Sequence, residues 1–301
     1  MTDSFSEKLV WIVIPTWNRC EDLIECLDSL NKVTYKHLRI VVVDNASSDE
    51  TVYSVEKLYP KVEIIRLSEN LGAPKASNIG FEYALDHDAD YILRLDSDTI
   101  VGSGFLEPLI EVAEDNPKIG VLSPKIYYND PPDLIWYAGV DAHPWHFGSV
   151  NDQCNKKDAE ISDQSRFVDY VWGAAMLIKR EVIEKTQGFD PDFFIYHEEV
   201  DFCLRVKDLG YQLYYVAESS ILHKVGTQNP TEWSGYHWNL SKAKLFKKHA
   251  NNRGHLFLLI IYSLGYSLSD NFLFLVGIRK FSRNRGPISD SLRGLWYGFK
   301  V

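Results

Sequence analysis

Short apolar runs alternate with helical repeats of apolar residues along the first hundred positions. The runs lie at 9–14 (LVWIVI), 38–43 (LRIVVV), 62–67 and 91–95. Runs this short that end at polar or turn residues are typical of buried strands. Leu23, Leu27 and Leu30 repeat at helical spacing, and helices are also expected at 51–58 and 73–85. This alternation predicts βαβ units and a mainly parallel sheet that helices cover on both faces.

The pattern changes past Gly120. An aromatic, proline-rich and polar stretch occupies 130–164, and short helices are expected at 180–186 and 198–209, before Gly188 and Gly210. The last sixty residues are basic with helical repeats. We therefore expect an α/β domain over 1–238, made of two halves (1–120 and 121–238), followed by a helical extension over 239–301.

Composition points to a folded protein in a reducing compartment. Apolar residues make up 45% of the 301 positions and charged residues 25%, values that are ordinary for globular proteins. The four cysteines form no C-x-x-C pair, and the N-terminus lacks the basic and then apolar pattern of a secretory signal. A cytoplasmic location is the expectation.

Charge is distributed unevenly along the chain. Residues 242–301 contain 11 Lys and Arg against Asp270 and Asp290, a net charge of +9, which leaves −19 for residues 1–241. A basic extension on an acidic body suggests an anionic partner, and its many Leu, Ile and Phe residues favour lipid over nucleic acid. The apolar runs at 256–264 and 272–278 are each shorter than the ~20 residues of a spanning helix. We expect interfacial helices at the inner face of the membrane, with a homodimer interface as the alternative.

The stretch Asp96-Ser97-Asp98 follows directly on the strand expected at 91–95. In an extended chain, alternate side chains point to the same side, so the two carboxylates can share one cation. Mg²⁺ is commonly held by one or two carboxylates together with substrate phosphates. A solvated turn would explain an isolated pair equally well. In parallel sheets, however, ligands bind at the carboxyl ends of the strands, where Pro15-Thr16 and Asp44-Asn45 also lie.

Several other motifs are open to two interpretations. Asp44 and Asn45 either recognise a base and ribose or shape a turn. In NLGAPKASNIG, the backbone near Gly72 together with Lys75 and Asn78 either faces a pyrophosphate or forms a glycine turn before a helix. His223 is a lone histidine that offers one metal ligand.

Acidic residues gather at the start of the helix expected at 198–209. Glu198, Asp201 and Arg205 share one helical face, where Asp201 can pair with Arg205. Glu199 lies about 100° away around the helix and is a candidate general base. Acids in a first helical turn also complement the helix dipole and need no further role.

Taken in order, IPTWNR, VDNASSD, NLGAPKASNIG, LDSDT, WGAAMLIKR, FIYHEEVDFCLR and ILHK resemble glycosyltransferase family 2. The resemblance spans about 10–225 and is strongest to rhamnosyltransferase-like members that build cell-surface polysaccharides. It implies the GT-A fold, an inverting reaction, and a nucleoside-diphosphate sugar such as dTDP-rhamnose or a UDP-sugar as donor. The implied acceptor is a glycan or a lipid-linked saccharide.

The resemblance also assigns roles to residues. It implies that Pro15, Thr16, Asp44 and Asn45 hold the nucleoside, that Asp96 lies against the ribose and metal, and that Asp98 binds Mn²⁺ or Mg²⁺. His223 matches a histidine that completes the metal or diphosphate site in several relatives. Gly173 and Ala174 would approach the donor sugar and Trp172 the acceptor. Glu199 stands where the family usually has aspartate, which leaves Glu198 as a rival base.

Two other functions fit parts of this pattern. A nucleotidyltransferase would also use acids and a metal, but it should carry a glycine-rich loop after the first strand, and IPTWNR contains no glycine. A non-catalytic sugar-nucleotide or glycan-binding subunit of the same fold would have no need of a general base.

Overall fold

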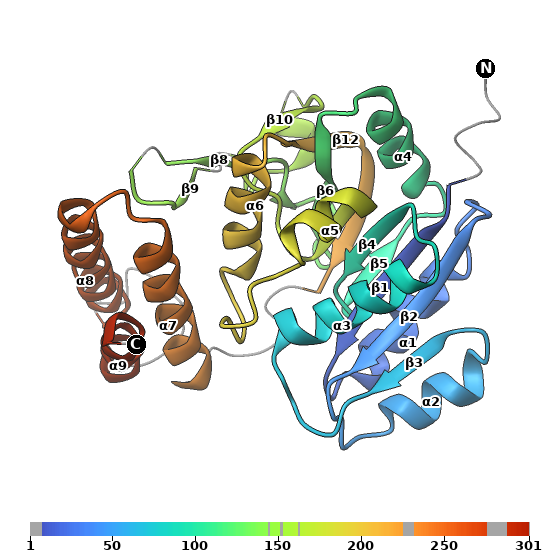
Figure 1. Ribbon diagram of the computed structural model, residues 1–301, viewed down its shortest axis with the longest axis horizontal. Coiled ribbons are helices and arrows are strands. Elements are labelled where there is room, and N and C mark those ends of the chain that lie inside the picture. Colours follow the sequence, from blue (N-terminus) through green and yellow to red (C-terminus); the bar gives the residue numbers. More distant parts are fainter. Residues whose placement is uncertain are drawn as a thin grey trace.

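The protein is described by a computed structural model, which describes residues 8–143, 145–150, 153–161, 163–224, 232–275 and 288–300. The N-terminal half alternates strands and helices as the sequence predicts (Figure 1). Its elements are β1 (Val10–Thr16), α1 (Cys20–Leu30), β2 (Leu38–Asp44), α2 (Thr51–Leu58), β3 (Glu63–Arg66), α3 (Ala73–Asp86) and β4 (Tyr91–Leu95).

The second half mixes short strands and helices before the chain ends in three helices. Its elements are β5 (Thr99–Val101), α4 (Leu106–Asp115), β6 (Ile119–Tyr128), β7 (Ile135–Tyr137), β8 (Asp141–Ala142), β9 (Ser149–Val150), the 3-10 turn η2 (Asp158–Glu160), β10 (Arg166–Val168), β11 (Ala175–Lys179), α5 (Arg180–Thr186), α6 (Glu198–Asp208) and β12 (Gln212–His223). The C-terminal helices are α7 (Glu232–His249), α8 (Arg253–Leu275) and α9 (Ile288–Lys300).

One ten-stranded sheet forms the core, with the strand order β10-β12-β6-β11-β4-β1-β2-β3 along its main path. Strands β4, β1, β2 and β3 are parallel, whereas β11 runs antiparallel between β4 and β6. The carboxyl ends of β1, β2 and β4 therefore open onto one edge. The residues that end these strands carry the polar motifs of the sequence.

Helix α3 packs closely on β1 and β2 at Gly80. A Cβ atom on Gly80 would lie 2.2 Å from Cγ1 of Val13 and 3.1 Å from Cγ2 of Val43, which is too close for either contact. Both valines are fully buried and have no room to withdraw.

Replacing Gly80 with alanine is therefore expected to destabilise the protein. Alanine gains about 1 kcal/mol of helix propensity, whereas overpacking typically costs about 1 to 3 kcal/mol. The approach of 2.2 Å to Val13 places the cost in the upper part of that range, so the expected net loss of unfolding free energy is about 1 to 2 kcal/mol. Urea denaturation measures it. Gly104→Ala is the control, because its added Cβ meets nothing within 4 Å. Equal or higher stability of the Gly80 variant would contradict the packing described for α3.

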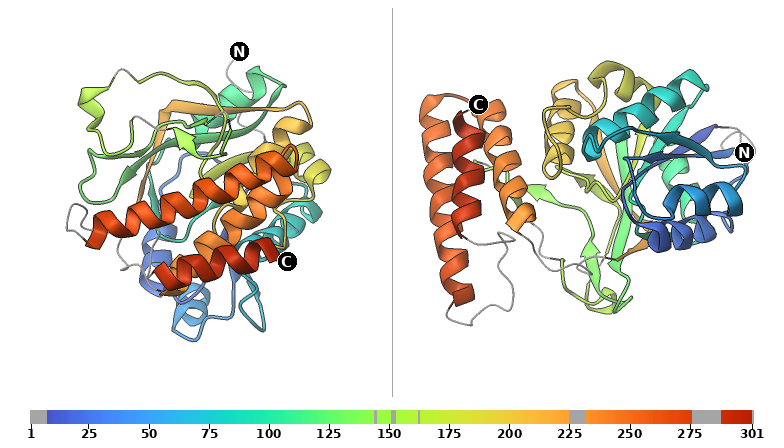
Figure 2. Two further views of the ribbon diagram at one scale, coloured as in Figure 1. Left: turned by 90° about the vertical axis from the view of Figure 1, so that its left-hand side faces the viewer. Right: turned by 90° about the horizontal axis from the view of Figure 1, so that it is seen from below.

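The three C-terminal helices form a layer beside the α/β domain, and α7 lies nearest to that domain, on the side of α6 (Figures 1 and 2). Helix α7 begins before the domain boundary expected at 239, so a division at that position would cut through a helix. The first apolar run and the start of the second lie within α8, while residues 276–278 lie outside the described part of the chain. Among the described residues, no helix combines the length and the apolar character that crossing a membrane requires.

Candidate active site

Asp96, Asp98 and His223 converge at the end of β4. The turn after β4 carries both aspartates, and the next strand, β5, pairs antiparallel with β12 so that Thr99 lies opposite His223. Nε2 of His223 is 3.0 Å from Oδ1 of Asp98 and 3.7 Å from Oδ2 of Asp96. One ligand atom from each residue lies within 4.8 Å of the others. Strand pairing across more than a hundred residues therefore assembles the cluster.

The charges of Asp98 and His223 stabilise each other. Burial opposes ionisation of Asp98, but the hydrogen bond and charge of His223 outweigh it, so the pKa of Asp98 lies below its ordinary value. Burial likewise opposes protonation of His223, yet the bond to Asp98 leaves the pKa of His223 above its ordinary value. The surroundings of Asp98 thus favour its ionised form, and an ionised carboxylate is the form that binds a cation.

This donor set fits a hard divalent cation. Two carboxylates and one imidazole nitrogen that lie this close together are ligands that Mn²⁺ or Mg²⁺ accepts. Asp96 and Asp98 keep side-chain exposures of 29% and 17%, so the point remains open to a substrate phosphate. The fold thus brings together the three residues that were expected to bind a metal ion. Experiment decides which of the two ions they bind.

Arg94 is a positive group at the site that the sequence motifs did not identify. It sits in the middle of β4 with a side-chain exposure of only 7%, and its Nη1 lies 2.6 Å from Oδ1 of Asp96. The same guanidinium donates to the carbonyl oxygen of Gly173. The backbone N–H of Asp96 donates to Ala174 at 2.9 Å. Residues 173 and 174 are thereby fixed against the aspartates, next to the point where a donor sugar is expected.

The two glutamates at the start of α6 differ in their surroundings. Glu198 is buried, and burial together with the charge of Glu199 raises the pKa of Glu198 to about 8. Glu199 is half-buried, and its Cβ lies 3.7 Å from the position that a Cβ on Gly173 would take. Glu198 is therefore largely neutral at pH 7 and enclosed, whereas Glu199 borders the sugar-facing segment.

Two tryptophans form a wall beside the histidine. The ring of Trp136, in β7, has its centroid 4.5 Å from that of His223 and 4.4 Å from that of Trp172. Trp172, the expected acceptor residue, is therefore connected to the carboxylate cluster through Trp136. No sequence motif identified Trp136, because it lies within the stretch 130–164, whose fold the pattern of residues did not predict.

The ends of β1 and β2 lie side by side, as expected for a nucleoside site. Thr16, which follows Pro15, is the register partner of Asp44, and the N–H of Asn45 donates to the carbonyl of Thr16. Both oxygens of Asp44 accept from the N–H of Ser47. The amide of Asn45 bonds to Asn70, to the N–H of Leu71 and to the carbonyl of Gly72. Asn45 thus also holds the next loop in place.

The start of α3 differs from the expected pyrophosphate cradle. The N–H groups of Leu71, Gly72 and Ala73 already donate to Asn45, Asn70 and Phe194. Gly72 has φ +87°, and a Cβ there would lie 2.5 Å from the carbonyl oxygen of Phe194. The glycine is therefore needed for the turn. Lys75, exposed on the first turn of α3, is a side chain there that could reach a phosphate.

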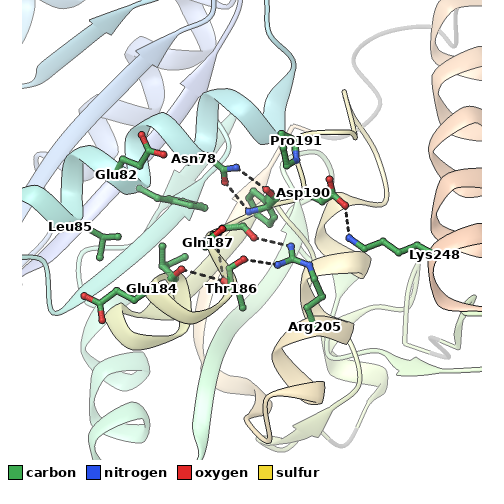
Figure 3. A pocket seen from close by; sticks show the side chains of 14 residues that line it. Asn78, Glu82, Leu85, Glu184, Thr186, Gln187, Asp190, Pro191, Arg205 and Lys248 are labelled. Carbon is green, nitrogen blue, oxygen red and sulfur yellow. Dashed lines mark hydrogen bonds and ion pairs between the residues drawn. The ribbon is translucent and has the colours of Figure 1, made fainter. Parts of the chain in front are cut away.

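Asn78 has a structural role. Its amide donates to the carbonyl of Phe189 and accepts from the N–H of the same residue, as Figure 3 shows. It lines a cavity of about 710 Å³ that Asp96, Asp98 and His223 do not line. Both polar ends of the Asn78 side chain bind the neighbouring loop. We therefore do not include Asn78 among the residues proposed to contact the nucleotide.

Asp201, in α6, binds two side chains of α7. The predicted pair with Arg205 forms at 2.8 Å, and Nζ of Lys248 and Nε2 of His249 lie 2.7 and 2.8 Å from the other oxygen of Asp201. Arg205 also donates to the carbonyls of Thr186 and Gly188. The Asp201 carboxylate is fully buried, and the cations Arg205 and Lys248, from two helices, compensate its charge.

Asp201→Asn is expected to weaken the fold in a pH-dependent way. Burial opposes ionisation, but His249, Lys248 and Arg205 outweigh it and lower the pKa of Asp201 from 3.8 to about 2. A lowered pKa contributes stability above the unfolded-state value that is lost as the pH falls through the folded value, so about 2 kcal/mol should disappear between pH 4 and pH 2. Urea denaturation at both pH values should show a smaller fall for the variant; an equal fall would contradict this assignment.

The mixed α/β architecture is similar to that of solved structures with the GT-A fold. A crystal structure of GalNAc-T7 with UDP, GalNAc and Mn²⁺ superposes with a TM-score of 0.65 at 17% identity. That match covers 86% of this chain, which spans about half (51%) of the GalNAc-T7 chain. Staphylococcus aureus TarS 1-349 gives a TM-score of 0.56 at 16% identity, covering 90% of this chain and 76% of TarS.

The family follows from the sequence match. The model of glycosyl transferase family 2 matches residues 11–187, more than half of the chain, so the chain belongs to this family. It is 27% identical to the N-acetylglucosaminyl-diphospho-decaprenol L-rhamnosyltransferase of Mycobacterium tuberculosis over 232 residues, 70% of this chain and 75% of the relative. It is 26% identical to the rhamnosyltransferase WbbL of Escherichia coli, covering 77% and 90%. The rhamnosyltransferase-like resemblance and the enzyme class are confirmed.

Proposed function

We propose that this protein transfers a sugar, with inversion, from a nucleoside-diphosphate sugar to a glycan or lipid-linked saccharide during cell-surface polysaccharide synthesis. dTDP-rhamnose is the first donor to test, because Shigella flexneri RfbF, a dTDP-rhamnosyl transferase, is 22% identical over 225 residues. A UDP-sugar is the second, since GalNAc-T7 and TarS were both solved with UDP. The observation that carries the proposal is the convergence of Asp96, Asp98 and His223 at the sheet edge beside the start of α6.

Asp98, Asp96 and His223 would hold Mn²⁺ or Mg²⁺. When bound, such an ion neutralises the charge that develops on a departing diphosphate. Lys75 at the start of α3 adds a second positive group on the phosphate side. Pro15, Thr16, Asp44 and Asn45 would enclose the nucleoside at the ends of β1 and β2.

Glu199 is the proposed general base. It would accept the proton of an acceptor hydroxyl as that oxygen attacks the anomeric carbon from the face opposite the leaving diphosphate. The Cβ of Glu199 lies beside Gly173, whose carbonyl binds Arg94. Trp172 and Trp136 would support the acceptor sugar. Glu198 is buried in its neutral form and would position the helix start.

The donor is tested by thermal-shift measurement of the full chain with dTDP, UDP and GDP, each with and without Mn²⁺. The proposal expects one nucleotide to raise the melting temperature, and to do so only with the metal present. A matched series with Asp98→Asn should show no metal-dependent rise. If no nucleotide stabilises the native chain under either condition, the proposed donor class is wrong.

The proposed location is the cytoplasm, peripheral to the inner face of the membrane, where lipid-linked acceptors are found. The charge of +9 over residues 242–301 supports a contact with anionic lipid. A homodimer through the C-terminal helices is the competing arrangement, and nucleic acid is not expected as a partner.

A further inference from the structure

Two residues directly before α6 have an unusual backbone conformation. Tyr196 has φ +69° and His197 has φ +63°, so both lie in the left-handed region that residues other than glycine seldom occupy. Two such residues in succession persist only where the surrounding structure holds them in place. We call this pair the left-handed turn. Because Glu198 and Glu199 follow it immediately, its conformation sets the direction in which both glutamates leave the start of α6.

Helix α7 contacts the left-handed turn and the residue before it. The ring of Trp238 has its centroid 4.4 Å from that of His197 and 5.3 Å from that of Tyr196. Ser241, which is buried, donates a hydrogen bond of 2.7 Å from its Oγ to the carbonyl oxygen of Ile195. Side chains three positions apart share one face of a helix. One face of α7 therefore contacts the backbone that leads into α6.

The same face of α7 also holds the earlier part of the loop between α5 and α6. Nζ of Lys244 donates to the carbonyl oxygen of Asp192. Lys248 pairs with Asp190, as Figure 3 shows. Together with Trp238 and Ser241, these lysines are spaced by three or four positions, the spacing of a single helical face. The loop is thus attached to α7 at several points along its length.

The packing of α7 does not by itself explain these contacts. Leu245 and Phe246 of α7 are buried, and the helix also packs along α9. Those apolar contacts hold α7 in the fold. Trp238 and Ser241 instead contact the three residues that precede the glutamates. Their contacts stabilise a conformation that the loop would seldom adopt without support.

We propose that Trp238 and Ser241 are positioning residues for the proposed base: by holding the left-handed turn against α7, they fix the direction of Glu199. The Cβ of Glu199 lies 3.7 Å from the position that a Cβ on Gly173 would take, so a change at the turn would move the Glu199 side chain relative to this segment. The inference rests on the proposed function, in which Glu199 accepts the proton of the acceptor hydroxyl. The contacts that support the inference do not depend on that function.

The test compares Trp238→Ala with Tyr236→Ala in the full chain. Tyr236 is an aromatic residue of the same helix, and its ring packs beside that of Tyr297 on α9. We expect Trp238→Ala to lower the kcat of sugar transfer by about tenfold or more without raising the donor KM, because a misplacement of about 1 Å can cost about a hundredfold. Tyr236→Ala should keep the native kcat. Trp238→Phe retains a ring beside His197 and should recover most of the loss.

Hydrogen exchange measures the turn without reference to activity. Exchange of peptides that cover residues 195–203 should be faster in Trp238→Ala than in the native chain, and unchanged in Tyr236→Ala. Ser241→Ala, which removes one hydrogen bond to the loop, should lower kcat and speed exchange by a smaller factor. It provides the same test if Trp238→Ala does not fold, which melting temperatures check.

Two results would overturn the proposal. One is a native kcat in both Trp238→Ala and Ser241→Ala. The other is an equal loss of kcat in Trp238→Ala and Tyr236→Ala, which would show that α7 contributes only general stability. If the native chain transfers no sugar, the proposed function fails, and the exchange measurement alone then decides whether α7 holds the start of α6.

Discussion

Glu199→Gln is expected to reduce sugar transfer by about 10²- to 10⁴-fold, the usual contribution of a positioned general base. The amide retains the size of the side chain but cannot accept a proton from the acceptor hydroxyl. Glu199 is half-buried and adjoins Gly173, whereas the residues proposed to hold the nucleoside belong to the ends of β1 and β2. Binding of the sugar nucleotide should therefore stay within about threefold of the native value, so that kcat falls and the donor KM does not rise.

Glu198→Gln is the matched control for this prediction. Because burial and the charge of Glu199 raise the pKa of Glu198 to about 8, glutamine closely mimics its form at pH 7. The expected loss of transfer is less than about tenfold, or about 1.4 kcal/mol. A larger loss in the Glu198 variant than in the Glu199 variant would reverse the assignment and make Glu198 the base.

Asp98→Asn is expected to reduce metal-dependent transfer by about 10³-fold or more, since a metal that stabilises leaving-group charge contributes several kcal/mol. The substitution removes the carboxylate that lies 3.0 Å from Nε2 of His223 and also lowers the charge that attracts a cation. Unlike the Glu199 variant, this one should lose Mn²⁺-dependent nucleotide binding together with turnover. Isothermal titration with the nucleotide that stabilises the native chain, with and without Mn²⁺, separates the two effects.

Asp133→Asn is the control for a lost carboxylate charge, because Asp133 is 53% exposed and pairs with the surface residue Lys157. It should bind metal and nucleotide as the native chain does. Undiminished Mn²⁺-dependent binding in the Asp98 variant would contradict the metal site. It would leave the aspartates with only the role of pairing with Arg94 and His223.

The regular elements were predictable because their signals are local. Helices α2 and α5 begin and end where their patterns indicate, and β4 covers the five residues of its apolar run. The Asp201–Arg205 pair also formed as expected, since i, i+4 spacing alone brings the side chains together on a helix. Asp96 and Asp98 could be identified because the packing of apolar side chains does not explain two acidic residues directly after a buried strand.

The partners of these residues could not be predicted, because they depend on distant parts of the chain. Arg94 reaches Gly173, 79 positions away, and Asn78 binds Phe189, 111 positions away. Nothing around Asn78 distinguishes a ligand-binding amide from one that fixes a loop. The same holds for the expected pyrophosphate cradle: the N–H groups of Leu71, Gly72 and Ala73 donate to residues that approach only in the folded chain, and contact with a phosphate stays a prediction.

The most direct test of the central claim is release of nucleoside diphosphate from dTDP-rhamnose and UDP-sugars, with a lipid-linked saccharide acceptor and with or without Mn²⁺. We expect the native chain to release nucleoside diphosphate from one donor in a metal-dependent way. Both Asp98→Asn and Glu199→Gln should abolish this release. Nucleotide binding should survive only in the Glu199 variant. Metal-dependent binding without turnover on every donor would contradict the account and favour a subunit that binds sugar nucleotides without transferring them.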